Sequence, residues 1–142
     1  MREINFRETK LLAEQGDADA QFSLGYMYYS GDGIQESDAE AFKWYRLAAE
    51  QGHGRAQNSL GLLHEYGEGV PKNDTEAVKW YRLAAEQGNV GAQFDLARMY
   101  DTGSGVPKND TEAVKWFRLA AEQGSLSAEY FLALMNEGGT ER

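Results

Sequence analysis

Apolar and small residues recur along this chain with two periods. Within a segment they are spaced by three, four and seven positions, as at Ala20, Leu24 and Met27, which places them on one face of a helix. Across the chain the segments return every 36 residues, and the tetrapeptide Ala-Glu-Gln-Gly begins at residues 13, 49, 85 and 121. A period between roughly 20 and 50 residues is typical of a solenoid, whose units bury their apolar faces against one another. The pattern therefore predicts an all-α stack of helical units.

Each 36-residue unit predicts two helices. The first begins with a cap residue and ends at a Gly-x-Gly turn such as Gly67 to Gly69, because glycine suits the left-handed residue that commonly closes a helix. The second opens with a capping box such as Asn73 to Glu76, and it carries one buried tryptophan. The four cap residues are Asp17, His53, Asn89 and Ser125, of which the histidine is unusual; the tryptophans are Trp44, Trp80 and Trp116.

The 142 residues are predicted to form one domain of about eight helices. The expected parts are a half-unit helix over 2–15, repeats over 16–51, 52–87 and 88–123, a terminal half-unit helix over 124–137 and a polar tail over 138–142. Glu8 stands where the other second helices carry tryptophan. Two interpretations remain open: Glu8 caps the end of the rod toward water, or residue 1 is an excision point in a longer array.

Composition narrows the classes of function. The net charge of −9 argues against nucleic acid as a partner, because such binding needs clustered Lys and Arg. The lack of cysteine excludes disulfides, thiolate zinc sites and cysteine nucleophiles. No apolar run approaches the roughly 20 residues of a membrane span, so no membrane insertion is expected. The first dozen residues lack the apolar segment of a secretory signal. The cytoplasm is the favoured compartment, while a mature or excised form without its signal stays open.

The chain offers little catalytic chemistry. The Gly-x-Gly turns follow helices, and two of the three precede Val-Pro-Lys-Asn, so they indicate helix ends rather than phosphate loops. His53 and His64 are the only imidazoles, and a metal site needs several converging ligands. No nucleophile, base and acid can be placed together. We therefore expect no cofactor, no metal and no enzymatic activity.

The repeated pattern resembles one family. It reads Leu-Gly-x-x-Tyr-x-x-Gly-x-Gly-Val, then Asp, then Ala-x-x-Trp-Tyr-x-x-Ala-Ala-x-Gln-Gly, and over residues 5–137 it is similar to the Sel-one-like repeat (SLR) family of tetratricopeptide-like solenoids. The resemblance implies a right-handed α-solenoid of antiparallel helix pairs that acts as an adaptor or scaffold for protein complexes. Two features depart from the family. The first-helix tyrosine, Tyr28 and Tyr100, is replaced by His64 and Asn136, and the paired cysteines of many secreted members are absent.

By analogy with tetratricopeptide solenoids, the first helices are expected to line the concave face. Four columns of positions 36 residues apart would face this groove, and they vary most between repeats, whereas the core columns barely change. The columns are Asp19, Arg55, Gly91 and Ser127; Phe22, Asn58, Phe94 and Tyr130; Tyr26, Leu62, Arg98 and Leu134; and Tyr29, Glu65, Asp101 and Glu137.

This groove would combine exposed aromatic residues with a row of carboxylates. Phe22, Tyr26, Tyr29 and Phe94 are expected to be exposed anchors, and the carboxylate row favours a protein or peptide partner that carries Lys or Arg. The prediction is a non-catalytic interaction scaffold. Three alternatives are open: the aromatic residues pack against neighbouring helices, the half-unit ends stack the chain end to end, or the chain is a designed or consensus-like array without a natural ligand.

Overall fold

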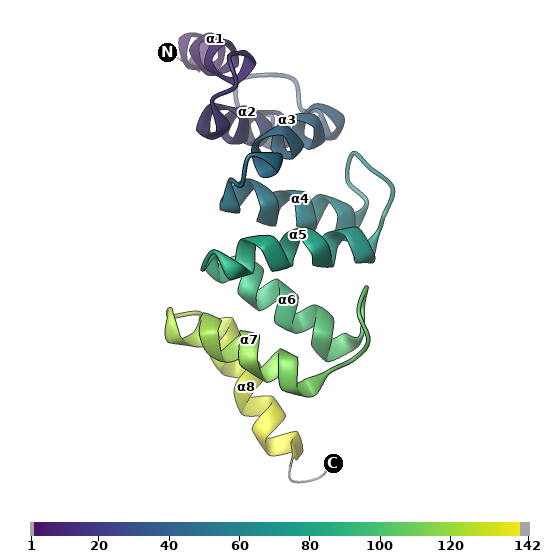
Figure 1. Cartoon of the computed structure of the whole chain (residues 1–142). Coiled ribbons are helices and arrows are strands. Elements are labelled where there is room, and N and C mark those ends of the chain that lie inside the picture. The colour runs from purple at the N-terminus through teal and green to yellow at the C-terminus, as the bar shows by residue number, and fades with distance from the viewer. Residues whose placement is uncertain (1, 140–142) are drawn as a thin grey trace.

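The structure, a computed structural model, describes the backbone of residues 2–139 and the side chains of residues 5–136. The described residues form eight helices joined by short turns (Figure 1). These are α1 (Arg2–Glu14), α2 (Ala18–Ser30), α3 (Asp38–Glu50), α4 (Gly54–Tyr66), α5 (Asp74–Glu86), α6 (Val90–Thr102), α7 (Asp110–Glu122) and α8 (Leu126–Gly139). The predicted all-α solenoid is confirmed.

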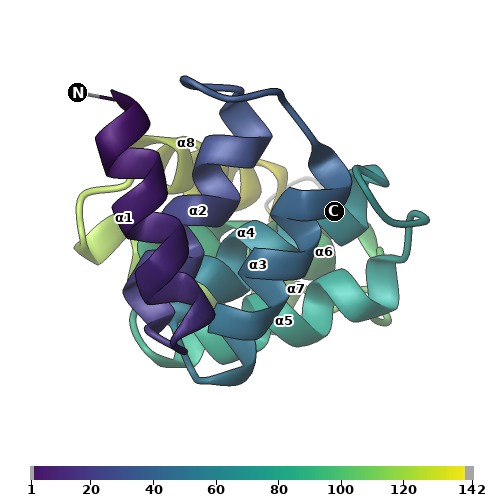
Figure 2. The same ribbon diagram turned by 90° about the horizontal axis from the view of Figure 1, so that it is seen from above.

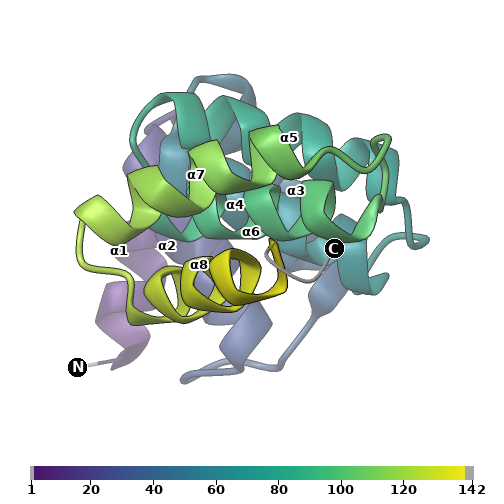
Figure 3. The same cartoon turned by 90° about the horizontal axis from the view of Figure 1, so that it is seen from below.

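Each helix packs chiefly on the helices before and after it in the chain, so the rod has α1 at one end and α8 at the other (Figure 1). Seen from the α1 end, α2 lies between α1 and α3 (Figure 2). Seen from the α8 end, α5 and α7 lie on one side and α6 and α8 on the other (Figure 3). The first helices of the pairs, α2, α4, α6 and α8, therefore share one side of the rod, and we call their variable columns the first-helix face.

The helix boundaries follow from local chemistry. The Asn73 side chain accepts a hydrogen bond from the backbone N–H of Glu76 at 3.0 Å, as a capping box requires. His53 does the same at the start of α4, where its Nδ1 accepts from the N–H of Ala56 at 3.1 Å. The unusual cap residue is thus a working cap. At the other end of α4, Gly67 closes the helix with φ 66°, in the left-handed region.

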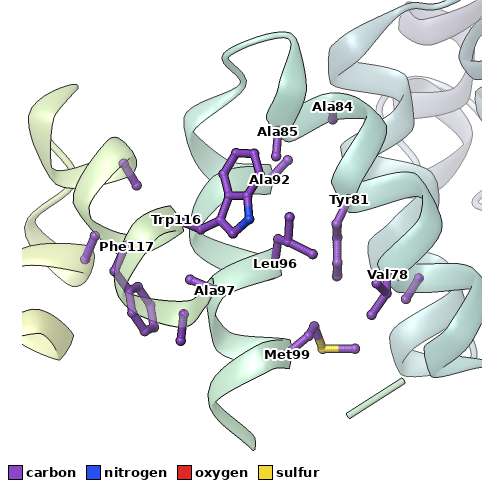
Figure 4. Close-up of a cluster of buried hydrophobic side chains, with 14 residues drawn as sticks. Val78, Tyr81, Ala84, Ala85, Ala92, Leu96, Ala97, Met99, Trp116 and Phe117 are labelled. Atoms are coloured by element: carbon purple, nitrogen blue, oxygen red, sulfur yellow. The ribbon is translucent and has the colours of Figure 1, made fainter. Parts of the chain in front are cut away.

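The core lies between the two helices of each pair and between successive pairs. In the third repeat Leu96 of α6 lies between Tyr81 of α5 and Trp116 of α7, and all three are buried (Figure 4). A close approach of helices explains the small column beside these residues. A Cβ added to Gly61 would lie 2.5 Å from Cε1 of Tyr81, a distance that real Cβ atoms essentially never show.

Buried glutamines link the repeats, a feature that the sequence analysis did not identify. In each full repeat a first-helix glutamine donates from Nε2 to a carbonyl of the preceding second helix, as Gln57 does to Ala49 at 3.1 Å. Its Oε1 accepts from the glutamine that follows the next second helix, as it does from Gln87 at 2.7 Å. The other pairs are Gln21 with Gln51 and Gln93 with Gln123. These buried amides therefore hold neighbouring repeats together by hydrogen bonds, and both the nitrogen and the oxygen of each amide have a partner.

Candidate functional site

The first-helix face is exposed at its α2 end and at its α8 end. Tyr26 and Tyr29 of α2 are 55% and 38% exposed, and Tyr130 and Leu134 of α8 are 62% and 43% exposed. Large aromatic and aliphatic side chains on a solvated surface are typical of binding sites when they gather together. All four belong to the columns that were predicted to face the groove, and Tyr26 and Tyr29 were also predicted to be exposed anchors.

A hollow of about 460 Å³ lies beside Tyr26, between α2 and the start of α4. Its walls include Phe22, Tyr26, His53 and Arg55. The Phe22 ring stacks on the His53 ring with centroids 5.0 Å apart, and the Arg55 guanidinium carbon lies 4.7 Å from the Phe22 centroid. The hollow therefore offers both an apolar surface and a cationic group.

Asp19 and Tyr29, the other two candidate residues of α2 that carry polar groups, lie at the solvent-exposed surface. The Asp19 side chain is 93% exposed, and its Oδ1 lies 2.9 Å from Nε2 of His53. The Tyr29 hydroxyl donates to Glu68 at 3.2 Å. In the same column as Asp19, Ser127 is exposed, and Gly91 is half-buried next to Asn58.

The expectation that Phe22 and Phe94 are exposed anchors is wrong. Both are half-buried, because each ring packs against the second helix of its own pair. Phe22 lies 5.6 Å from Tyr45 between ring centroids, and Phe94 lies 5.7 Å from Phe117 and 5.6 Å from Phe131. Leu62 of the next column also packs on the core. For these positions the alternative, that large side chains pack against neighbouring helices, is the correct interpretation.

The middle of the first-helix face is occupied by an internal charge network. Glu65 is only 8% exposed, and both its oxygens accept from Arg98, Oε2 from Nη1 at 2.8 Å and Oε1 from Nη2 at 2.7 Å. The Tyr81 hydroxyl donates to Glu65 Oε1 at 2.7 Å. Asp95 accepts from Asn58 at 3.3 Å and lies 3.4 Å from Arg98. Five side chains from α4, α5 and α6 thus satisfy one another across a repeat boundary.

The pKa values of the two carboxylates beside Arg98 are shifted in opposite directions. Burial alone would raise the pKa of Glu65, but the hydrogen bonds from Arg98 and Tyr81 outweigh it, so its pKa lies below the usual 4.5. Burial raises the pKa of Asp95 above 3.8, because its single long contact with Arg98 compensates less. Glu65 is therefore ionised at neutral pH and forms an ion pair with Arg98.

The carboxylate row is consequently not a free acidic surface. Glu65 is paired internally, and Asp101 is half-buried with its Oδ1 4.0 Å from the Lys108 ammonium. The side chain of Glu137 lies outside the described residues. A basic partner would therefore meet at most a partly compensated row at these positions.

No arrangement for metal chemistry is found among the residues that the structure describes, where no three His, Cys, Asp or Glu side chains converge. Along residues 2–139, none of the eight helices combines the length and the apolar character that crossing a bilayer requires.

The family of the chain follows from its repeats. The Sel1 repeat family model matches residues 18–53, 54–89, 90–125 and 126–142. A comparison with curated proteins found no match.

Solved structures that are similar to this chain include the following three. The crystal structure of c5321, a protective antigen present in uropathogenic Escherichia coli strains displaying an SLR fold, is 43% identical with a TM-score of 0.91, covering 94% of this chain and 29% of that chain. A Sel1 repeat protein from Oxalobacter formigenes is 42% identical with a TM-score of 0.84, covering 88% of this chain and 51% of that chain. Helicobacter pylori cysteine rich protein B (hcpB) is 26% identical with a TM-score of 0.68, covering 88% of this chain and 95% of that chain. The chain thus spans about a third and about half of the first two relatives.

Proposed function

Because the chain belongs to the Sel1 repeat family, whose members are generally non-catalytic scaffolds for protein interaction, we propose that it binds a peptide or partner protein on its first-helix face. The observation that carries the proposal is the exposed Tyr26 beside the hollow of about 460 Å³. Exposed tyrosines next to a concave surface are favourable anchors, because they bury much area at little loss of conformational freedom.

The charges of the face suggest how a partner is oriented. Arg55 is exposed, and no carboxylate among the described residues lies within ion-pair distance of it. It would donate hydrogen bonds to a carbonyl or carboxylate of the partner near the hollow. The net charge of −9 and the exposed Asp19 favour Lys or Arg elsewhere in the partner. The preference for basic residues rests on this general field, since Glu65 is already neutralised by Arg98.

Selection from a displayed random-peptide library tests the proposal. The variant Tyr26→Ala/Tyr29→Ala truncates two exposed side chains and is expected to keep the fold, whereas Phe94→Ala would damage the core. The matched control is Leu83→Ala, because Leu83 is 39% exposed on the second helix α5. The wild type and the control should enrich the same peptides, and the double variant should lose them. Recovery of those peptides on the double variant would refute this function.

Self-association through α8 is a second candidate. In the described part of the chain α8 exposes Leu126 by 78% and Tyr130 by 62%, an apolar surface of the kind that pairs with another helix. Strict end-to-end stacking on α1 is disfavoured by Glu8, which is exposed at the position where Trp44 is buried in its own repeat. Sedimentation velocity over a range of concentrations checks this candidate. A mass that rises with concentration, and falls back in Tyr130→Glu, would support it; a constant monomer mass would exclude it.

A further inference from the structure

A second cavity, of about 190 Å³, lies between α3, α4 and α5 and shares no wall with the hollow beside Tyr26. Its apolar walls are Phe42, Leu60 and Trp80, and His64 of α4 also lines it. Four charged residues complete the lining: Arg46, Glu50, Glu76 and Lys79.

The neighbouring repeats show which group these walls are built to surround. The eight positions that line the cavity correspond, 36 residues earlier in the chain, to Phe6, Lys10, Glu14, Leu24, Tyr28, Glu40, Lys43 and Trp44. Only two differ, Arg46 in place of Lys10 and His64 in place of Tyr28. The rings also take similar orientations, since Phe42 meets His64 edge-on at 5.4 Å and 86°, and Phe6 meets Tyr28 edge-on at 6.0 Å and 90°. The imidazole thus stands in the place of a tyrosine ring but is shorter and has no hydroxyl.

The third repeat shows what a tyrosine hydroxyl at this position contacts. There Tyr100 occupies the same column, and its hydroxyl accepts a hydrogen bond from the guanidinium of Arg82. The Arg82 guanidinium carbon also lies 5.5 Å from the Tyr100 ring centroid. Arg46 is the counterpart of Arg82, but it finds no phenol oxygen and bonds Glu50 instead, from Nε at 3.1 Å.

One nitrogen of the histidine ring lacks a hydrogen-bond partner. His64 is 7% exposed, and no described group forms a hydrogen bond with its buried Nδ1. Burial also lowers the pKa of His64 below 6.5, so the ring is neutral at pH 7 and has both a donor and an acceptor nitrogen. Because Nδ1 is covered, a ligand in the cavity would meet the imidazole at its other nitrogen, and a ligand that brings a hydrogen-bonding atom would suit it.

We propose that this cavity binds the phenol ring of a partner's tyrosine, with the ring against Trp80 and Leu60 and the hydroxyl between Arg46 and His64. A neutral phenol fits better than an anion, because the cations Arg46 and Lys79 are balanced by Glu50 and Glu76. It fits better than a plain benzene ring, because the hydroxyl gives Arg46 the oxygen that Tyr100 gives Arg82. The site is independent of the first-helix face, and each can fail without the other.

A titration with N-acetyltyrosinamide, followed by amide and indole N–H signals, tests the proposal on the full chain. The expected result is saturable shifts that include the Trp80 indole. N-acetylphenylalaninamide lacks only the hydroxyl, and its affinity should be lower by a factor of about ten or more. A hydrogen bond to a charged group contributes about 1.5 kcal/mol or more, which corresponds to that factor. Absence of saturable shifts, or equal binding of the two amides, would overturn it.

Three variants locate the binding. His64→Tyr supplies the missing phenol and should abolish the Trp80 shifts. Arg46→Met changes an exposed side chain, leaves the cavity open and should weaken the tyrosine amide about tenfold while sparing the phenylalanine amide. The converse variant Tyr100→His should create a second site, reported by the Trp116 indole. Retention of full binding in both His64→Tyr and Arg46→Met would place the ligand elsewhere and refute the assignment.

Discussion

The charge network between the second and third repeats gives the sharpest test of how this rod is held together. Arg98→Met removes the cation that both oxygens of Glu65 contact, and it leaves Glu65 and Asp95 as buried, uncompensated carboxylates. Removing one partner of a buried pair typically costs about 3–5 kcal/mol. The Arg98 side chain is 24% exposed, so the lower end, about 3 kcal/mol, is expected here. For a chain of this size that corresponds to a melting temperature about 6–12 °C lower.

Two further measurements separate this charge effect from lost packing. In a double-mutant cycle with Glu65→Gln and Arg98→Met, the coupling energy should be about 2 kcal/mol. The exposed pair of Arg46 and Glu50, with side chains 58% and 49% exposed, is the matched control and should couple by about 0.5 kcal/mol or less. Urea denaturation followed by far-UV circular dichroism gives all of these values.

The stability difference between the wild type and Arg98→Met should depend on pH in a defined direction. In the wild type the pKa of Glu65 is lowered, so its contribution is present above 4.5 and is lost as pH falls below that value. In Arg98→Met the burial that remains raises the pKa, and Glu65 takes up a proton as pH falls from 7 to 4. The stability difference between the two proteins should therefore shrink toward pH 4. A loss below about 1 kcal/mol at pH 7, or a difference that does not change with pH, would refute the reasoning.

Three other predictions concern single positions. Gln57→Ala removes two hydrogen bonds, to the Ala49 carbonyl and from the Gln87 amide, and should cost about 1–3 kcal/mol in urea denaturation. Gln15→Ala, at the exposed counterpart of Gln87, should stay within about 0.5 kcal/mol. Gly61→Ala forces Tyr81 to move and should lower the free energy of unfolding by about 1–3 kcal/mol. Ala97→Gly, at the equivalent position of the third repeat, should lower it by about 1 kcal/mol or less. Equal losses of stability in the two variants would contradict the close approach of the helices at Gly61. The wild type should be less stable to urea at pH 5.5 than at pH 7.5. The pKa of His64, which faces Glu76, Arg46 and Lys79, is lowered in the folded protein, so the unfolded chain binds more protons as pH falls below 6.5. His64→Tyr should lose less stability over this range, and an identical loss would exclude His64 as the cause.

The fold could be predicted from the sequence because every repeat states the same pattern again. The cap residues, the Gly-x-Gly turns and the buried tryptophans each recur at one phase of the 36-residue period. The buried glutamine links between repeats could also have been found this way. Gln21, Gln57 and Gln93 form an unvarying polar column next to buried alanines, and such a column indicates a buried hydrogen bond.

The candidate site could be predicted only in part, because periodicity within one helix does not reveal what the next helix presents. Phe94 is half-buried owing to Phe117 and Phe131, and Phe131 belongs to a later half-unit. Glu65 is neutralised by Arg98, which lies 33 positions later in a different column. Tyr26 is exposed as expected, with 55% of its surface accessible. Variation between repeats therefore marked both true surface and repeat-specific internal contacts.

The first-helix face is tested most directly by mapping where a bound partner lies. A peptide enriched in the library selection is titrated into isotope-labelled chain, and amide shifts are followed along α2 to α7. Binding on the proposed face should concentrate the shifts around Tyr26, Tyr29 and Arg55 and leave the outer residues of α5 and α7 unchanged. Shifts concentrated on the second helices, with Tyr26 and Arg55 unaffected, would contradict the proposal.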